Sequence, residues 1–134
     1  MNVCSVEWRE PVHGMLTVSL TIQMRPWTTN SERRGNRYQR ATNTKEWREL
    51  AFYAARSANP PTITDATAIV DVWLKGRLQD CGACHPSVKA LIDGLVDANV
   101  LHDDTGEHLT MISFKAPQRA KSDGLAVHLT GWLA

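Results

Sequence analysis

The strongest constraint on how this chain folds is a segment near its N-terminus in which apolar and polar residues alternate. The apolar members, separated by Thr, Ser and Gln, are Leu16, Val18, Leu20, Ile22 and Met24. Successive side chains of an extended strand point to opposite faces, so this period of two predicts a strand over 15–24 with one buried face. The β-branched residues in the segment favour the same structure.

Two later segments have the period of a helix instead. The first is predicted over 44–58, where Thr44 is the cap and the Asn-Pro-Pro run 59–61 ends the helix. The second begins at Pro86, and its apolar residues recur at the spacing of one helical face: Val88, Leu91, Ile92 and Leu95. Asn99 tolerates the left-handed conformation that is common just past a helix end, so we expect the second helix to end there.

Further strands are predicted over three segments, which are 66–74, 107–115 and 124–131. The element order is then β-α-β-α-β-β. This order predicts an α/β (α+β) fold, with a small mixed sheet and both helices covering one of its faces. The length of 134 residues corresponds to one domain. We place it at 15–134, after a loosely attached N-terminal leader over 1–14.

The composition indicates a compartment. The chain has three cysteines, an odd number, whereas a secreted disulfide scaffold uses an even and denser set. The N-terminal residues show no signal peptide, and the apolar stretches are too short to span a membrane. We therefore expect a cytoplasmic protein with reduced thiols and no membrane partner.

The formal net charge of +1 conceals two segments of opposite charge. Residues 25–56 hold eight Lys and Arg against three Glu, whereas residues 80–107 hold six Asp and Glu against one Lys. A neutral total therefore does not exclude a nucleic-acid-binding protein. It is also what a phosphate-seeking segment beside a cation-seeking segment would produce.

The basic segment begins with residues 25–43, which show no period and predict a long polar loop. Guanidinium groups pair with phosphates, and the aromatic residues interleaved among them can stack on unpaired bases. The predicted DNA contacts, which include one residue from the loop 75–85, are Arg25, Arg33, Arg34, Arg37, Arg40, Lys45 and Arg77. A merely solubilising loop is the alternative interpretation.

The sixteen residues from Lys89 to Asp104, KALIDGLVDANVLHDD, resemble the signature of the RusA family of Holliday junction resolvases. That signature is a helix of the form K-A-x-x-D-x-L-x-x-A followed by an apolar step into D-D. The order of elements over 15–131 resembles the family as well. The resemblance implies a homodimeric, Mg²⁺-dependent endonuclease, for which Mn²⁺ can substitute, that cuts branched DNA such as four-way junctions in recombination and repair.

By position, the resemblance assigns Asp104 to the metal and Lys89 to assisting catalysis, and Asp93 matches a recurrent helix carboxylate. The acidic pair that precedes the helix in the family falls here on Ala83 and His85, so it does not match. The nearest substitute is Asp80. The catalytic candidates are therefore Asp80, His85, Lys89 and Asp104, and the candidate metal ligands are Asp80, Asp103 and Asp104.

The residues alone leave simpler interpretations open. Lys89 and Asp93 lie four residues apart and could form an exposed salt bridge on a helix. Asp103 and Asp104 could belong to a turn, because Asp-Asp-Thr-Gly is a natural turn sequence. His85 could replace a carboxylate as a metal ligand, orient a water molecule, or simply precede Pro86 at the start of a helix.

Two cysteines add a further alternative. Cys81, Cys84 and His85 fit half of a zinc site, and they also fit the C-x-x-C-H pattern of haem attachment. Three functions of different classes therefore follow from the sequence. They are a branched-DNA endonuclease, a relative that binds branched DNA without cutting it, and a small zinc-binding module.

Overall fold

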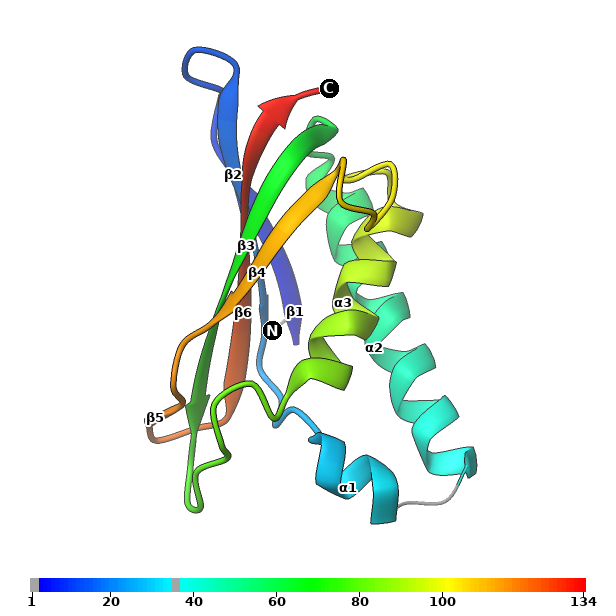
Figure 1. The fold of residues 1–134 in the computed structure, drawn as a ribbon, viewed down its shortest axis with the longest axis vertical. Coiled ribbons are helices and arrows are strands. Elements are labelled where there is room, and N and C mark those ends of the chain that lie inside the picture. The colour runs from blue at the N-terminus through cyan, green and yellow to red at the C-terminus, as the bar shows by residue number, and fades with distance from the viewer. Residues whose placement is uncertain (1–2, 35–36) are drawn as a thin grey trace.

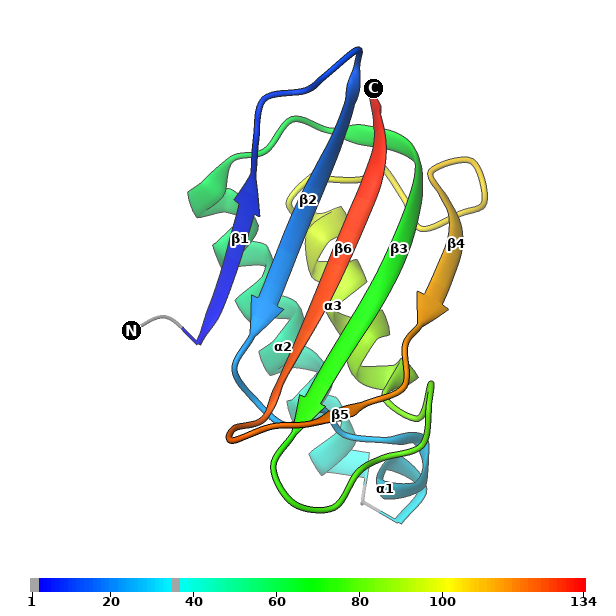
Figure 2. The same cartoon turned by 90° about the vertical axis from the view of Figure 1, so that its left-hand side faces the viewer.

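The computed structural model describes residues 3–34 and 37–134, and of residues 32–34 it describes the backbone alone. Within that part of the chain, six strands form one mixed sheet in the order β1-β2-β6-β3-β4, with β5 beside β3 (Figure 2). The strands are β1 (Cys4–Trp8), β2 (Met15–Ile22), β3 (Ile63–Leu74), β4 (Leu109–Phe114), β5 (Gln118–Arg119) and β6 (Gly124–Leu133). The helices are α1 (Thr29–Arg34), α2 (Arg37–Ala58) and α3 (His85–Asp97).

The predicted fold class is confirmed. Strand β3 runs parallel to β4 and β5, and the other neighbouring strands pair antiparallel, so the sheet is mixed. Figure 1 shows α2 and α3 on the same side of the sheet, as the element order predicts, with α1 at one end of the molecule. In the part of the chain that the structure describes, the opposite face of the sheet carries no helix (Figure 2).

The core lies between the sheet and these two helices. Four of the five alternating residues predicted for the first strand, Leu16, Val18, Leu20 and Ile22, are buried in β2, whereas Met24 lies beyond the strand end and is only partly buried. Val88, Leu91, Ile92 and Leu95, the stripe predicted for the second helix, are buried along α3. Burial of one such side chain stabilises the fold by about 1.5–3 kcal/mol, so these two patterns largely determine which faces meet.

Helices α2 and α3 cross at very close range. A Cβ atom at Gly94 would collide with the carbonyl oxygen of Arg48 and lie 2.7 Å from the Cβ of Ala51. Because backbone cannot yield as a flexible side chain does, this crossing requires glycine. The close crossing places the exposed sides of the two helices next to each other.

The leader predicted over 1–14 is wrong for residues 4–8. These residues form β1, which pairs with β2, and Cys4 and Val6 are buried. The alternation covers only five residues, which is too short a pattern to separate a strand from a loop. The segment is therefore recognisable mainly by its pairing with a neighbour.

The long loop predicted over 25–43 is also wrong in part. Residues 29–34 form α1, and α2 begins at Arg37 rather than at Thr44. The first turns of α2 bury little, since the buried residues of this helix are Trp47, Ala51 and Ala55. A helix without an apolar stripe has no period to detect, although Arg, Gln and Ala favour helix.

Helix α3 ends as predicted. Its last residue is Asp97, and Asn99 adopts a left-handed conformation with φ of 64°. The N–H of Val100 donates to the carbonyl of Leu95 at 2.9 Å, which closes the helix end. The chain then turns away from the helix axis toward β4.

Candidate functional site

An exposed stripe runs along α3, on the side away from the core. His85, Lys89 and Asp93 lie four residues apart, which places them one above another on the same helical face. The Nζ of Lys89 donates to Oδ1 of Asp93 at 2.9 Å. The simple salt bridge expected from the spacing is therefore present.

The loop after α3 brings a third residue to the same ammonium group. Val100 and Leu101 are buried and anchor the start of this loop. Farther along it, Oδ2 of Asp104 accepts a hydrogen bond from the Nζ of Lys89. Lys89, Asp93 and Asp104 thus form one group, which we call the lysine–aspartate cluster.

The cluster is partly exposed. The side chain of Lys89 is 47% exposed, and those of Asp93 and Asp104 are 26% and 30% exposed. The groups are therefore accessible to a ligand from solvent. The pairing alone adds little to stability, because salt bridges at such exposure contribute about 0–1 kcal/mol.

Asp103, a predicted metal ligand, makes a local contact. Its Oδ1 accepts the backbone N–H of Asp104 at 2.7 Å, which is the turn interaction anticipated for the Asp-Asp-Thr-Gly sequence. Asp103 therefore helps to orient Asp104.

Asp80, the other predicted ligand, lies in the loop between β3 and α3 and is exposed. Its carbonyl oxygen accepts the N–H of Ala83 at 3.0 Å. The described residues contain no group of three or more His, Cys, Asp or Glu side chains placed to hold a metal ion. The structure thus does not bring Asp80 into one ligand group with Asp103 and Asp104.

The cysteine segment before α3 is divided between surface and core. Cys81 is exposed, and its Sγ donates to the carbonyl of Phe114 at 3.3 Å. Cys84 is buried, and burial raises the pKa of its thiol to about 11. A zinc ligand must be a thiolate, so this environment opposes metal binding by Cys84. His85 is exposed, with its ring 6.2 Å from that of Phe114.

A basic surface covers the N-terminal half of α2. Arg37, Arg40 and Lys45, all predicted DNA contacts, are exposed there. Together with Ala41, Thr44 and Arg48 they line a hollow of about 560 Å³. We call this surface the basic half of α2.

Arg48 has a different role from its neighbours. Its Nε and Nη2 donate to the two carboxylate oxygens of Asp97 at 2.6 and 2.9 Å. This bidentate pair joins α2 to the end of α3. The guanidinium lowers the pKa of Asp97, and the carboxylate raises the pKa of Arg48.

The remaining predicted DNA contacts fall into three groups. Arg25 donates to the carbonyls of Lys75 and Arg77 at 3.3 and 2.8 Å, so it ties the end of β2 to the loop after β3. Arg77 itself is exposed. Arg33 and Arg34 belong to α1, and their side chains lie outside the described residues.

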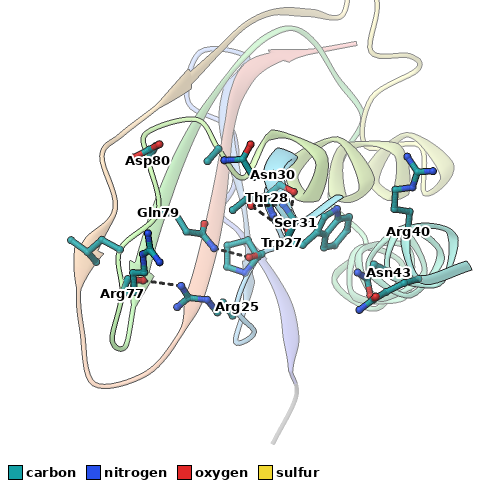
Figure 3. Close-up of a pocket in the computed structure, with 14 residues that line it drawn as sticks. Arg25, Trp27, Thr28, Asn30, Ser31, Arg40, Asn43, Arg77, Gln79 and Asp80 are labelled. Carbon is teal, nitrogen blue, oxygen red and sulfur yellow. Dashed lines mark hydrogen bonds between the residues drawn. The ribbon is translucent and has the colours of Figure 1, made fainter. Parts of the chain in front are cut away.

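A cavity of about 820 Å³ lies between the segment that follows β2, the start of α2 and the loop that precedes α3 (Figure 3). We call it the polar cavity. The lining residues with the chemistry of interest are Trp27, Arg40, Asn43, Arg77, Gln79 and Asp80. The predicted loops indicated its arginines, whereas its amide residues carried no signal in the sequence.

Two buried polar atoms of residues lining this cavity have no hydrogen-bond partner among the described residues: Nε1 of Trp27 and Oε1 of Gln79. The indole of Trp27 is held edge-on against Trp47, with ring centroids 5.1 Å apart. The amide nitrogen of Gln79 donates to the carbonyl of Pro26 at 2.8 Å, so only its oxygen is left. An unmet buried donor or acceptor costs about 1–3 kcal/mol, so these two side chains are held in place by the surrounding packing.

A polar chain crosses the helix-free face of the sheet, and sequence reasoning missed it. Ser19 Oγ lies 2.8 Å from Nδ1 of His128, and Nε2 of His128 lies 3.2 Å from Asp71. Asp71 also lies 3.4 Å from the Nζ of Lys115. These residues come from separate strands and the segment after β4, so only the pairing of strands brings them together.

No protein-family model matches the sequence, and no curated protein matches it significantly. None of the helices in the described residues combines the length and apolar character that crossing a bilayer requires.

Proposed function

We propose that this protein is a structure-selective DNA endonuclease that cuts four-way junctions or other branched DNA as a Mg²⁺-dependent homodimer. The observation that carries the proposal is the lysine–aspartate cluster. Its three members are the residues that the RusA-type signature marks, and they meet although Asp104 lies outside the helix that carries Lys89 and Asp93. The basic half of α2 adds a surface suited to phosphates.

The cluster fits a magnesium ion by its donor chemistry. Asp93 and Asp104 both reach the same Nζ, so two carboxylates lie close together at the surface. Mg²⁺ is commonly held by one or two carboxylates, with water and substrate phosphate as its other ligands. Bound there, it would polarise the scissile phosphate and lower the pKa of an attacking water.

Lys89 contributes charge in this scheme. Its two carboxylate partners orient the ammonium, and its side chain remains half exposed. An oriented donor stabilises the negative charge that develops on phosphate oxygens in the transition state. Arg37, Arg40 and Lys45 position the DNA backbone by phosphate contacts that do not depend on sequence.

A second candidate is a protein that binds branched DNA without cutting it. Ala83 and His85 stand where the family has an acidic pair, and Asp80 is exposed on its own loop. This candidate predicts salt-sensitive junction binding with no cleavage by any divalent metal.

The test is cleavage of a labelled synthetic four-way junction with Mg²⁺ or Mn²⁺, by the wild type, Asp104→Asn and a matched control, Asp97→Asn. Asp97 is also an ion-paired aspartate of this region, but its partner is Arg48. We expect the wild type and the control to cut, and Asp104→Asn to be slower by roughly 100-fold or more.

Equal cutting by the wild type and Asp104→Asn would remove the cluster from the mechanism. Junction binding by the wild type without cleavage would establish the second candidate instead.

A further inference from the structure

The polar cavity shares no lining residue with the lysine–aspartate cluster, and of its lining the proposed function uses Arg40 alone, as a phosphate contact. Arg40 and Arg77 line it, and neither guanidinium has an ion-pair partner among the described residues. Arg25 also lines it but is engaged by backbone carbonyls. With Asp80 as the acidic lining residue, the cavity has an excess of positive charge and suits an anionic ligand.

The uncharged lining is rich in carboxamides. Asn30 and Asn43 each present a donor and an acceptor, and Gln79 adds its carbonyl oxygen, a pattern that matches the polar edge of a nucleobase. Figure 3 shows Arg40 and Asn43 on α2 at one side of the cavity, and Arg77, Gln79 and Asp80 on the opposite loop. A ligand held between them would have to carry both negative charge and a polar ring or chain.

The size of the cavity and its unmet polar atoms limit the class of ligand that it can bind. A volume of about 820 Å³ lies within the usual range of small-ligand pockets, roughly 300–1,000 Å³, and a concave site cannot admit a duplex. Trp27 lines the cavity with an aromatic ring. Its indole N–H and the oxygen of Gln79 are buried without partners among the described residues, so a ligand would reach them only if these side chains turned toward it. Proteins that read an extruded base use such aromatic and hydrogen-bonding walls.

We propose that the polar cavity binds one unpaired nucleotide of a DNA strand. The base lies against Trp27 and the carboxamides, and its phosphate pairs with Arg40 and Arg77. The identity of the ligand as DNA rests on the proposed function, because branched DNA exposes unpaired nucleotides at its crossover. Such binding would give the enzyme a preference for unpaired nucleotides at the branch point without any contact to paired bases.

The test is titration of the full-length, ¹⁵N-labelled protein with deoxynucleoside 5′-monophosphates, followed by two-dimensional NMR. Inorganic phosphate and 2-deoxyribose 5-phosphate are the comparison probes. We expect saturable shifts of the Trp27 indole N–H and the Gln79 amide with the nucleotides, and affinity at least roughly ten-fold weaker with either comparison probe.

Variants locate the site. Arg40→Ala and Gln79→Ala should weaken nucleotide binding by roughly ten-fold, the effect of removing one contact of this kind. The matched controls Arg56→Ala, an exposed arginine later on α2, and Gln118→Ala, an exposed amide on β5, should leave it unchanged. Trp27→Phe keeps an aromatic ring but removes the indole N–H, so it tests whether that donor contributes to nucleotide binding. The NMR spectrum of the variant shows directly whether it is folded.

Junction binding by the same samples separates this inference from the proposed function. If the protein binds junctions but shows no NMR shifts with nucleotides, the nucleotide-binding inference is overturned and the proposed function is unaffected. Nucleotide shifts without junction binding would support the pocket and overturn the proposed function. Equal binding of phosphate and nucleotides would overturn the role of the base.

Discussion

The lysine–aspartate cluster and the basic half of α2 lie on helices that pack directly together, yet their charges are arranged in opposite ways. In the cluster, one ammonium meets two carboxylates. On α2, Arg37, Arg40 and Lys45 have no ion-pair partner among the described residues. An ammonium oriented by carboxylates suits stabilisation of charge at one reacting group, whereas cations without partners attract a polyanion over a wide surface.

The largest difference should appear when the central cation of the cluster is removed. Lys89→Gln should lower kcat for junction cleavage by roughly 100- to 1,000-fold, the usual cost of losing one oriented transition-state donor. Stability should change by less than about 1 kcal/mol, because the pairs are exposed. Single-turnover cleavage and urea unfolding measure the two effects, with Lys121→Gln as the control. Wild-type cleavage by Lys89→Gln would show that the cluster is only structural.

The next effect concerns the crossing that holds the two regions together. Gly94→Ala should destabilise the protein by about 1–3 kcal/mol, because the added methyl group meets backbone of α2. Gly106→Ala is the control, since nothing lies within 4 Å of a Cβ atom there. Urea unfolding measures both variants. Equal stability of the two would mean that the helices can separate at no cost.

A smaller effect should distinguish free cations from paired ones. Arg40→Ala should reduce the slope of log affinity against log salt for junction binding by about 0.7–0.9, since one phosphate contact is lost. Arg48→Ala should reduce it less, because Arg48 is already paired with Asp97. Fluorescence anisotropy at several salt concentrations gives both slopes. The reverse order would contradict the division of α2 into free and engaged cations.

The smallest expected effect is on stability, from the Arg48–Asp97 ion pair that joins α2 to α3. Arg48 lowers the pKa of Asp97 below its ordinary value of 3.8. The stability from this pair is therefore complete above that pH and is lost as pH falls through the lowered pKa. Arg48→Ala should lose less than about 1 kcal/mol at pH 7, and its difference from the wild type should shrink below pH 4. Urea unfolding across pH checks this, and a constant difference would contradict it.

The elements found from the sequence are those that bury a periodic apolar face. Strand β2 and helix α3 lie where the alternation of Leu16 to Ile22 and the stripe from Val88 to Leu95 place them. The missed elements, β1, β5, α1 and the first turns of α2, are short or bury little. Their stability comes from pairing and propensity, which leave a weak pattern in the chain.

The contacts of the candidate site also fall into two kinds, those that follow from local sequence and those that join distant segments. The contact of Lys89 with Asp93 follows from helical spacing, and the turn at Asp103 follows from local sequence. The sequence by itself thus determined the mixed fold with both helices on one face, and the ion pair on α3. The arrival of Asp104 at Lys89, the engagement of Arg25 and Arg48, and the polar cavity depend on segments distant in the chain. Tertiary structure decided these features, because no local period records which loops meet once the apolar faces are buried.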